Sequence, residues 1–520
     1  MNQQTTNTVT TTVLTQDAPA RPVIAPSPPS LLDSILESAP ATSSQSPDTF
    51  ARFLAEPSPA RAIRDWLGVL PDLPAAELKR YIGIRLNRDI ARLDALLSEQ
   101  VNAILHHPDF QKLEASWRSV RFLVEQTPEG ANVKIKLLNV SWRELTRDLT
   151  VRAIEFDQSE MFRKVYSDAF GMPGAEPFSV LIGDYEIRHR SSADYPYNDV
   201  ETLNAIAGVA AAAFAPFIAA AHPSLMELGS FAELEKPLNL TQTFERLDYL
   251  KWKAFRKKDD ARFVGLTMPR VLARLPYVDD NARVDGFRFR EDVSGPDRSN
   301  YLWGNAAYAF GAVLIRTFAD TGWLADIRGT RRGELSGGIV ANLPTHCFST
   351  DKIGIAPKCA TDAIVTDAQE KELGTLGFIP LCYCQDTEYS AFYGNQSVQE
   401  PHEYDQTSAT VNARMSAMLQ YTLCAARFAH YIKLMGRDRI GSFTTATEVR
   451  DALRRWLLTY STSNEKPDPR YPLREAHVEV EELADRPGSY TCKLFLRPHY
   501  QLDQLATVLK LESTLAPIKK

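Results

Sequence analysis

The feature that most constrains the fold is the spacing of apolar residues, which changes several times along the chain. Over residues 78–104 they recur in steps of three and four, which predicts a single helix of about thirty residues. Over residues 133–138 they alternate instead with Lys134 and Lys136, which predicts a β-strand. Strands are also predicted at 178–182 and 263–267, and helices at 109–124, 241–257 and 304–319. Strands that alternate with helices predict an α/β or mixed α+β body.

The longest apolar run extends from Ala205 to Ala221 and is mostly alanine. It contains Pro216 and is shorter than the ~20 residues that a bilayer crossing needs, so we predict a buried helix without membrane insertion. The first residues lack the basic start and apolar run of a secretory signal. Six cysteines in 520 residues are too few for a disulfide scaffold. The sequence therefore predicts a soluble, cytoplasmic protein.

Residues 1–55 are predicted to form a disordered tail. The first 50 residues contain 16 Ser and Thr residues, 7 prolines and one aromatic residue, too little apolar surface to offset the entropy lost on ordering. A short amphipathic helix is predicted within this tail at 30–38, where Ser30 is suited to cap it. A helix this short is unstable alone in water, so its apolar stripe predicts binding in a groove of another protein. Packing back onto its own domain is the alternative.

The pattern changes again near residue 385, so we predict a body domain at 56–384 and a C-terminal domain at 385–520. Helices at 407–435 and 445–460 are followed by prolines and then by two strands, at 476–481 and 490–496. A turn sequence at 485–488 joins these strands into a hairpin with a longer loop. An alternating stretch from Leu505 to Leu511 predicts a third strand.

The sequence contains few groupings that carry chemistry. It has neither the GxxxxGK[ST] phosphate loop nor the HExxH zinc pattern. Cys382 and Cys384 form the one close cysteine pair, and Cys347 and Cys359 precede them without CxxC spacing, so we predict buried thiols and no metal or cofactor. Residues 251–258 interleave cations with aromatic rings, as in nucleic-acid binders. A solvated helix face is favoured, because the segment is followed by Asp259 and Asp260, and Trp252 and Phe255 share one face of a helix whose other face is charged. The net charge of −6 and the pI near 5.9 argue against a whole surface built to bind nucleic acid.

Several blocks, taken in order, resemble the large subunit of the type VI secretion contractile sheath, the TssC/VipB family. The resemblance runs from about residue 55 to the C-terminus. The blocks are 252–262, LTMPRVLARLPY (266–277), YLWGNAAYAF (301–310), KCATD (358–362), GFIPL (377–381), RFAHYIK (427–433) and RPHYQ (497–501). The resemblance implies a structural protein and no enzyme. It also implies a contractile-tail-sheath-like body with a C-terminal gpW/gp25-like helical and β-hairpin region.

The resemblance also implies partners. The chain would co-assemble with a small sheath subunit (TssB/VipA-like), and with further copies of itself, into a tube around an inner tube protein. This tube would meet a baseplate, in the bacterial cytoplasm, and its contraction would expel the inner tube and spike. The helix at 30–38 resembles a recognition tag for the AAA+ ATPase (ClpV-like) that recycles contracted sheaths. The matching residues are Leu31, Leu32, Asp33, Ile35 and Leu36.

A terminal hairpin with a free edge can accept strands from neighbouring chains through main-chain hydrogen bonds. Sheaths of this family resemble a mesh of such donated strands. The residues predicted to link subunits are Val478, Val480, Tyr490, Cys492, Leu494 and Leu496. An ordinary intrachain sheet is the alternative, and the resemblance favours exchange.

Two other functions stay open from the sequence. A cytoplasmic α/β enzyme with a dispersed active site predicts a deep pocket with clustered titratable groups, because catalytic residues are commonly distant in sequence. A phage tail-like or baseplate-like structural protein without contractile function is the second alternative.

Overall fold

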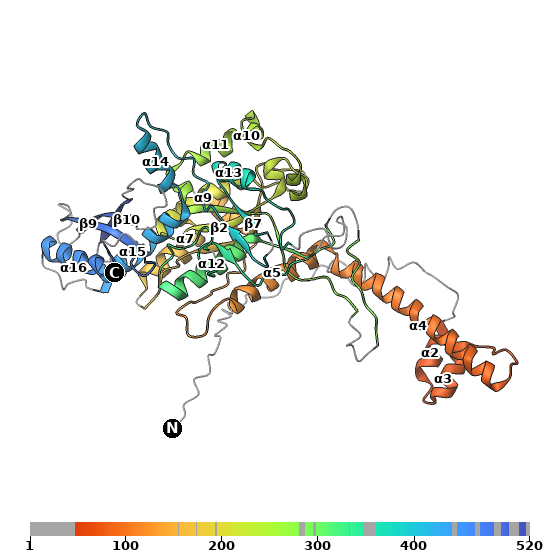
Figure 1. Cartoon of the computed structure of the whole chain (residues 1–520). Coiled ribbons are helices and arrows are strands. Elements are labelled where there is room, and N and C mark those ends of the chain that lie inside the picture. Colours follow the sequence, from red (N-terminus) through yellow and green to blue (C-terminus); the bar gives the residue numbers. More distant parts are fainter. Residues whose placement is uncertain are drawn as a thin grey trace, which may run out of the picture. The chain divides into compact units, whose positions relative to one another are not determined.

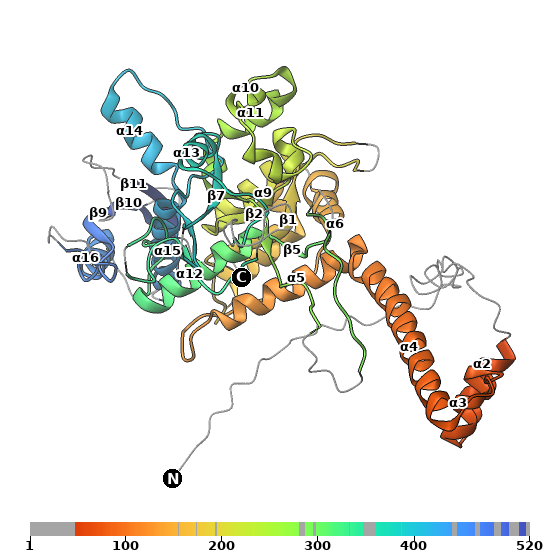
Figure 2. The same cartoon turned by 45° about the vertical axis from the view of Figure 1, so that its right-hand side comes forward.

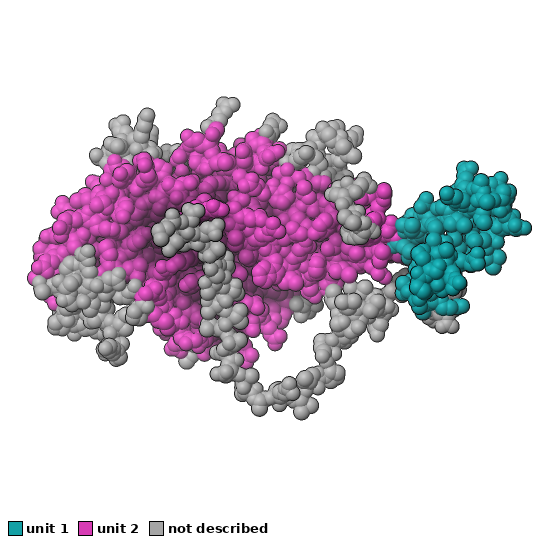
Figure 3. All heavy atoms as spheres, turned by 90° about the horizontal axis from the view of Figure 1, so that it is seen from below, with its two compact units in different colours: residues 1–93 teal, residues 94–520 magenta. Residues whose placement is uncertain are grey.

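The computed structural model describes most of the chain from residue 47 onward. The described ranges are 47–153, 155–172, 174–192, 195–279, 286–294, 298–331, 333–346, 359–385, 387–438, 445–462, 468–482, 490–498 and 509–515. The chain divides into two compact units, residues 1–93 and 94–520, which Figure 3 colours separately. The helix predicted at 30–38, with its proposed tag residues, and Cys347 lie outside the described residues. The predicted domain boundaries at 55/56 and 384/385 stay predictions.

The first unit contains the helices α2 (Pro47–Ala55) and α3 (Pro59–Leu67) and the beginning of α4 (Ala75–Leu105). The ring of Phe53 lies 5.2 Å from that of Trp66, whose Nε1 donates a hydrogen bond of 3.1 Å to Asp89. Residues 47–55 form a helix, although their composition placed them in the predicted disordered tail. The helix packs through Phe53 against Trp66, eleven residues beyond its end, and composition alone does not reveal this contact.

The helix α4 confirms the long helix predicted from the apolar spacing, but not a single one of its 31 residues is buried. Ile84, Ile90 and Leu97 are 60%, 53% and 48% exposed. Leu78, Ile82, Leu86, Val101 and Ile104 of the predicted stripe are half-buried, whereas Ile90, Leu93 and Leu97 are exposed. Exposed apolar residues on one helix face are typical of a helix that binds another protein.

The second unit is built on a six-stranded sheet, of which β2 and β7 are labelled in Figures 1 and 2. Its order is β1 (Leu181–Ile187), β2 (Phe217–Ala221), β3 (Val264–Met268), β7 (Phe378–Tyr383), β8 (Ser390–Phe392) and β6 (Ile339–Val340). The first four strands are parallel, and β8 pairs antiparallel with both β7 and β6. The helices α9 (Asp199–Ala213) and α12 (Ala306–Thr321) cover opposite faces: Phe217 and its alternate neighbours pack with α9, and Ile218 packs with α12. Both faces are therefore sealed, as parallel sheets require.

The buried helix predicted at 205–221 is wrong in its second half. The helix α9 ends at Ala213, Phe214 adopts a left-handed conformation with φ 51°, and residues 217–221 form β2, in which every residue is buried. Pro216 cannot continue a helix. A short apolar run that is buried on all sides carries no period, so the sequence did not distinguish the strand from a helix.

Three further predictions need correction. Residues 133–138 form no strand, since they pair with no described part of the chain. The helix predicted at 241–257 is broken into α10 (Leu240–Phe244), the 3₁₀ turn η6 (Leu247–Tyr249) and α11 (Leu250–Arg256). The helix predicted at 407–435 is interrupted where Ser397 pairs with Ala417 and Gln396 with Met418. It forms α14 (Thr407–Ser416) and α15 (Leu419–Asp438).

The C-terminal part consists of α15, α16 (Ala446–Leu458) and a separate three-stranded antiparallel sheet. Its strands are β9 (Leu473–Glu482), β10 (Tyr490–Pro498) and β11 (Leu509–Leu515), in the order β11-β10-β9. The predicted hairpin and third strand are thus present, with β11 beginning four residues later than Leu505.

The remaining elements of the second unit connect these layers. The helices are α5 (Pro108–Glu125), α6 (Trp142–Thr146), α7 (Glu160–Phe162), α8 (Asp168–Gly171) and α13 (Asp367–Thr375). The π-helical and 3₁₀ segments are η1 (Arg147–Arg152), η2 (Phe156–Gln158), η3 (Arg163–Ser167), η4 (Pro223–Met226), η5 (Phe231–Glu235) and η7 (Asp259–Phe263). A two-stranded ribbon pairs β4 (Val271–Leu272) with β5 (Trp303–Gly304).

Candidate functional site: the C-terminal sheet and helix α15

The strand β10 is the centre of the C-terminal sheet. It pairs with β9 from Tyr490 opposite Glu482 to Pro498 opposite Leu473, and with β11 from Tyr490 opposite Leu515 to Leu496 opposite Leu509. Its residues alternate strictly between buried and half-buried, because successive side chains of a strand point to opposite faces. One face of the sheet is therefore covered and the other is open.

The structure brings the six residues of the predicted inter-subunit strands together on the covered face. Tyr490 is 8% exposed, and Cys492, Leu494 and Leu496 are fully buried. Val478 is 4% exposed and lies opposite Leu494, while Val480 is half-buried and lies opposite Cys492.

These six residues do not all lie at a free edge. Four of them belong to β10, which is paired on both sides within this chain, and only Val478 and Val480 belong to an outer strand. Apart from one bridge between Ser461 and Leu473, the outer edge of β9 pairs with no described residue. Exchange at the free edge of β9 stays a prediction.

The helix α15 lies against the covered face of this sheet, as the two views in Figures 1 and 2 agree. One side of the helix, with Cys424, Phe428 and Ile432, joins the hydrophobic core beneath the sheet. The ring of Phe428 stacks on Trp323 at 4.2 Å, with 20° between their planes. On its outer strand β9 the sheet also packs against α16, through a face that includes Val449, Leu453 and Leu457.

The opposite side of α15 holds the body through cationic and imidazole side chains. Arg427 donates 3.2 Å to the hydroxyl of Ser179 and 3.0 Å to that of Tyr431, and its guanidinium also lies over the ring of Phe318. The Nε2 of His430, which is 1% exposed, donates 2.9 Å to the carbonyl of Ala213 at the end of α9. The helix therefore links the C-terminal sheet to the body.

Lys433 completes this side of the helix. Its ammonium lies 4.9 Å from the ring centre of Tyr166, 4.8 Å from Phe170 and 4.9 Å from Phe214, so three aromatic faces surround one cation. No carboxylate in the described chain forms an ion pair with it. Burial lowers the pKa of Lys433 to about 8 and that of His430 to about 4, because the charged forms lose their hydration.

Of the described cysteines, Cys359, Cys382, Cys424 and Cys492 are buried, whereas Cys384 is half-buried and contacts the hydroxyl of Tyr393. Burial raises the pKa of Cys492 to about 11 and those of Cys424 and Cys382 to about 12, so these thiols stay protonated at neutral pH. Among the described residues, no group of three His, Cys, Asp or Glu side chains is arranged to hold a metal ion.

The basic segment 251–258 also has a structural role. The rings of Trp252 and Phe255 are buried in the core, while Lys251, Lys257 and Lys258 are exposed to solvent. The aromatic rings are thus unavailable for stacking on bases, and these three lysines form a solvated face, whereas Arg256 is buried and donates to the carbonyls of Val398 and Thr375.

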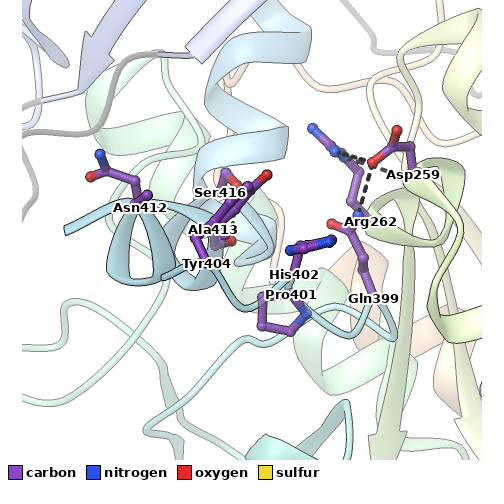
Figure 4. Close-up of a pocket in the computed structure, with 10 residues that line it drawn as sticks. Asp259, Arg262, Gln399, Pro401, His402, Tyr404, Asn412, Ala413 and Ser416 are labelled. Atoms are coloured by element: carbon purple, nitrogen blue, oxygen red, sulfur yellow. Dashed lines mark hydrogen bonds and ion pairs between the residues drawn. The ribbon is translucent and has the colours of Figure 1, made fainter. Parts of the chain in front are cut away.

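The described chain contains an open cavity of about 410 Å³ and another of about 330 Å³. The larger is lined by residues of η7, α14 and the segment between β8 and α14, and includes Asp259, His402 and Ser416. Figure 4 shows the Asp259 carboxylate between Arg262, at 2.9 Å, and Gln399, at 3.3 Å. The hydroxyl of Ser416 donates to the carbonyl of Ala413, and no described hydrogen bond joins His402 to either group. These side chains are not connected as an acid, base and nucleophile would be.

Comparison with known families decides the assignment. The tail sheath N-terminal domain described as VipB (EvpB/VC_A0108) matches residues 87–399, and the tail sheath gpW/gp25-like domain described as VipB_2 matches residues 408–515. The chain belongs to the VipB tail sheath family. It is a structural subunit of a contractile sheath, with the mixed α and β fold expected of that family.

One relative supports the VipB assignment over most of the chain. The type VI secretion system sheath protein TssC1 of Pseudomonas aeruginosa (strain PAO1) is 43% identical over 437 residues, which cover 83% of this chain and 86% of the relative.

Solved structures share less with this VipB chain. A sheath tail protein from Desulfitobacterium hafniense is 10% identical with a TM-score of 0.25, over 50% of this chain and 47% of that one. The anti-feeding prophage baseplate is 10% identical with a TM-score of 0.33, over 75% of this chain and 81% of that one. Neither score is high enough to support an argument about the fold, and the first likeness covers less than half of its protein.

The two VipB ranges meet along α15. Its residues 427, 430 and 433 belong to the gpW/gp25-like range, whereas the groups they contact, such as Ser179, Ala213 and Phe170, belong to the N-terminal range. The sequence identified the block 427–433 only as part of the resemblance and assigned it no role. A basic residue at every third position (427, 430 and 433) was the available signal, but only the fold supplies the groups that these residues contact.

No helix in the described part of the chain combines the length and apolar character that would be needed to span a bilayer.

Proposed function

We propose that this chain is the large subunit of a type VI secretion sheath. It pairs with a small sheath subunit, assembles with copies of itself into a helical tube around an inner tube, and docks on a baseplate in the bacterial cytoplasm. Contraction of that tube expels the inner tube and spike. The observation that carries the proposal is the 43% identity to a type VI sheath protein over 83% of the chain.

Two uncovered surfaces support assembly. The 31-residue helix α4 has no buried residue, and the exposed part of its apolar stripe, at Ile90, Leu93 and Leu97, is available to a partner helix. The outer edge of β9 is available to a strand donated by a neighbouring subunit. A net main-chain hydrogen bond contributes about 0.5–1.5 kcal/mol, so many parallel bonds in every subunit would keep the subunits joined while their bodies move.

Co-expression with a small sheath subunit tests the proposal. We expect tubes in negative-stain electron microscopy. Protein that stays strictly monomeric, or that is insoluble, under these conditions would contradict a role in sheath assembly.

A pair of proline variants tests strand exchange at β9. Successive N–H groups of a strand point to opposite sides, so Glu479→Pro and Val480→Pro remove one donor toward β10 and one toward the outer edge. The variant that loses the outward donor should keep the melting temperature of the isolated chain and form no tubes. Normal tubes from both variants would refute exchange at this edge.

We also propose that the N-terminal tail carries the recycling signal. An AAA+ ATPase (ClpV-like) would bind the stripe of Leu31, Leu32, Asp33, Ile35 and Leu36, and hiding this stripe in the extended lattice would make disassembly selective for contracted sheaths. Replacing Leu32 and Ile35 with Asp should abolish ATPase binding in a pull-down and leave tube assembly intact. The matched control replaces Val9 and Val13 of the same tail. Loss of assembly in the first variant would show that the helix belongs to the core.

A further inference from the structure

Residues 133–139 have the pattern of a strand but no strand partner. Apolar residues alternate with Lys134 and Lys136, and Ile135, Leu137 and Leu138 are 38%, 64% and 53% exposed. Between residues 134 and 139, no backbone N–H or C=O group is hydrogen-bonded to any described residue. An exposed segment with this pattern is either a loop whose sequence alternates by chance or a strand whose pairing partner belongs to another chain.

The segment is held in place, which argues against a free loop. The ammonium of Lys134 bonds Glu176 at 2.7 Å, and that of Lys136 lies 5.3 Å from the ring centre of Phe178. Further along, the hydroxyl of Tyr185 donates 2.7 Å to the carbonyl of Val140. Lys134 and Lys136 are two residues apart, and so are their partners Glu176 and Phe178. The segments 134–136 and 176–178 therefore run alongside each other in the same direction.

The C-terminal end of the segment is also anchored. Ser141 caps α6: its hydroxyl accepts a bond from the N–H of Glu144, and the Glu144 carboxylate accepts one from the N–H of Ser141. The main chain of residues 134–139 is therefore presented to solvent between fixed points. An exposed main chain of this kind recognises another strand, because only a strand matches its repeat of donors and acceptors.

We propose that residues 133–139 dock an extended strand of the small sheath subunit, in which apolar residues alternate with acidic ones. This inference rests on the proposed function, which supplies the second polypeptide. Cross-strand neighbours on one face interact directly, so apolar residues would cover Ile135 and Leu137, and carboxylates would face the two lysines. The ion pair of Lys134 with Glu176 does not block this, since both side chains are more than half exposed and the ammonium can donate to a second carboxylate.

A second copy of this chain is the less favoured occupant. Its strand β9 also alternates valine with glutamate, but Val478 is 4% exposed and packs in the core of its own sheet. This valine is therefore not available to cover Ile135 or Leu137.

The experiment is hydrogen exchange of the purified chain alone and in complex with the small subunit. We expect the amides of residues 134–139 to exchange at least tenfold more slowly in the complex. The double variant Lys134→Glu/Lys136→Glu should weaken the complex at least tenfold at low salt, and by less at high salt, because the lost contacts are exposed ion pairs. The matched control, Lys257→Glu/Lys258→Glu, reverses two exposed lysines elsewhere and should change the affinity less than twofold.

A second variant separates the main chain from the charges. Ile135→Pro removes one N–H group and leaves the net charge unchanged, so it should weaken the complex while the melting temperature of the isolated chain is preserved. The lysine variants are exposed and do not threaten folding, so they decide the question if the proline variant does not fold.

The outcomes distinguish this inference from the proposed function. A complex that forms while residues 134–139 exchange as fast as in the free chain overturns the docking site and leaves the proposed function standing. Slow exchange that appears in the isolated chain at high concentration assigns the surface to a second copy, and so overturns the choice of partner. Absence of any complex with the unmodified chain overturns both.

Discussion

The two sheets of this protein differ in how completely the chain itself covers their faces and edges. In the six-stranded sheet, every residue of β2 and β3 is buried, because α9 and α12 cover opposite faces. In the C-terminal sheet, β10 alternates between buried and half-buried residues, and one face and the outer edge of β9 are open. The first sheet completes its own core, whereas the second has room for contacts that this chain does not supply.

This difference suits a sheath subunit. A body that must keep its shape during contraction benefits from a closed core, and a connecting element benefits from open strand edges. The helix α15 joins the two, with an apolar side against the C-terminal sheet and cations against the body. Four predictions test whether the two sheets differ as described.

The largest effect is expected from Leu494→Pro. Leu494 is fully buried and lies in the central strand, so the variant loses a buried leucine, which costs about 2–5 kcal/mol, together with a ladder hydrogen bond. We expect the C-terminal sheet to lose protection in hydrogen exchange, with the six-stranded sheet still protected, and tubes to be absent. Normal tubes from this variant would show that the sheet is dispensable for assembly.

The next comparison uses one phenylalanine from each sheet. Phe378 is fully buried in β7 beside Trp252 and Phe244, so Phe378→Ala should lower the free energy of unfolding by about 3–5 kcal/mol. Phe495 lies on the open face of β10, near His477, and Phe495→Ala should cost about 1 kcal/mol. Urea unfolding measures both, and equal losses would mean that the outer face is more covered than the structure shows.

Lys433 tests the helix between the two sheets. Because burial lowers its pKa to about 8, the folded chain releases this proton before the unfolded chain, whose lysine titrates near 10.5. Between these pH values the unfolded state binds more protons, so stability rises with pH. The variant Lys433→Met lacks this gain and should be the more stable protein at pH 7, by on the order of 2–3 kcal/mol, an advantage that shrinks toward pH 10.

Thermal melting at pH 7.5 and pH 9.5 checks the Lys433 prediction, with Lys433→Arg as the variant that keeps the charge. A methionine variant that is less stable at pH 7.5 would show that the three aromatic rings stabilise the cation by more than burial destabilises it.

The smallest effect is expected on the open face of the C-terminal sheet. Lys493 pairs with Glu481 at 3.4 Å, but the glutamate is 67% exposed, so Lys493→Gln should cost less than about 1 kcal/mol and lose even that at high salt. Urea unfolding at two salt concentrations measures it. A loss above 2 kcal/mol would place this pair in a drier environment than an open face.

Several elements of the fold were predictable because their pattern is local. The spacing in α4 and the alternation in β10 each repeat over several turns or residue pairs, and both were predicted with boundaries close to those observed. The second half of the alanine-rich run was not, since β2 is buried on all sides and shows no period. The break between α14 and α15 was also not predicted, because it depends on pairing with residues 396–397, which lie outside the helical pattern.

The candidate site was likewise predictable only in part. The sequence predicted a strand at 490–496, and its alternate residues Tyr490, Cys492, Leu494 and Leu496 are buried on one face of β10. It did not predict that β10 lies between two strands of its own chain, because strand order depends on contacts between residues far apart in sequence.

The amino-acid sequence by itself determined which residues form long helices and strands, which face of each is apolar, and, through its ordered blocks, the sheath family. These properties follow from the short-range repeat of the backbone and from side-chain polarity. Only the tertiary structure decided which strand lies at an edge, which helix is left uncovered and which rings surround Lys433. Those outcomes depend on which elements pack against each other, and these contacts join residues that are far apart in the sequence. No local sequence pattern specifies them.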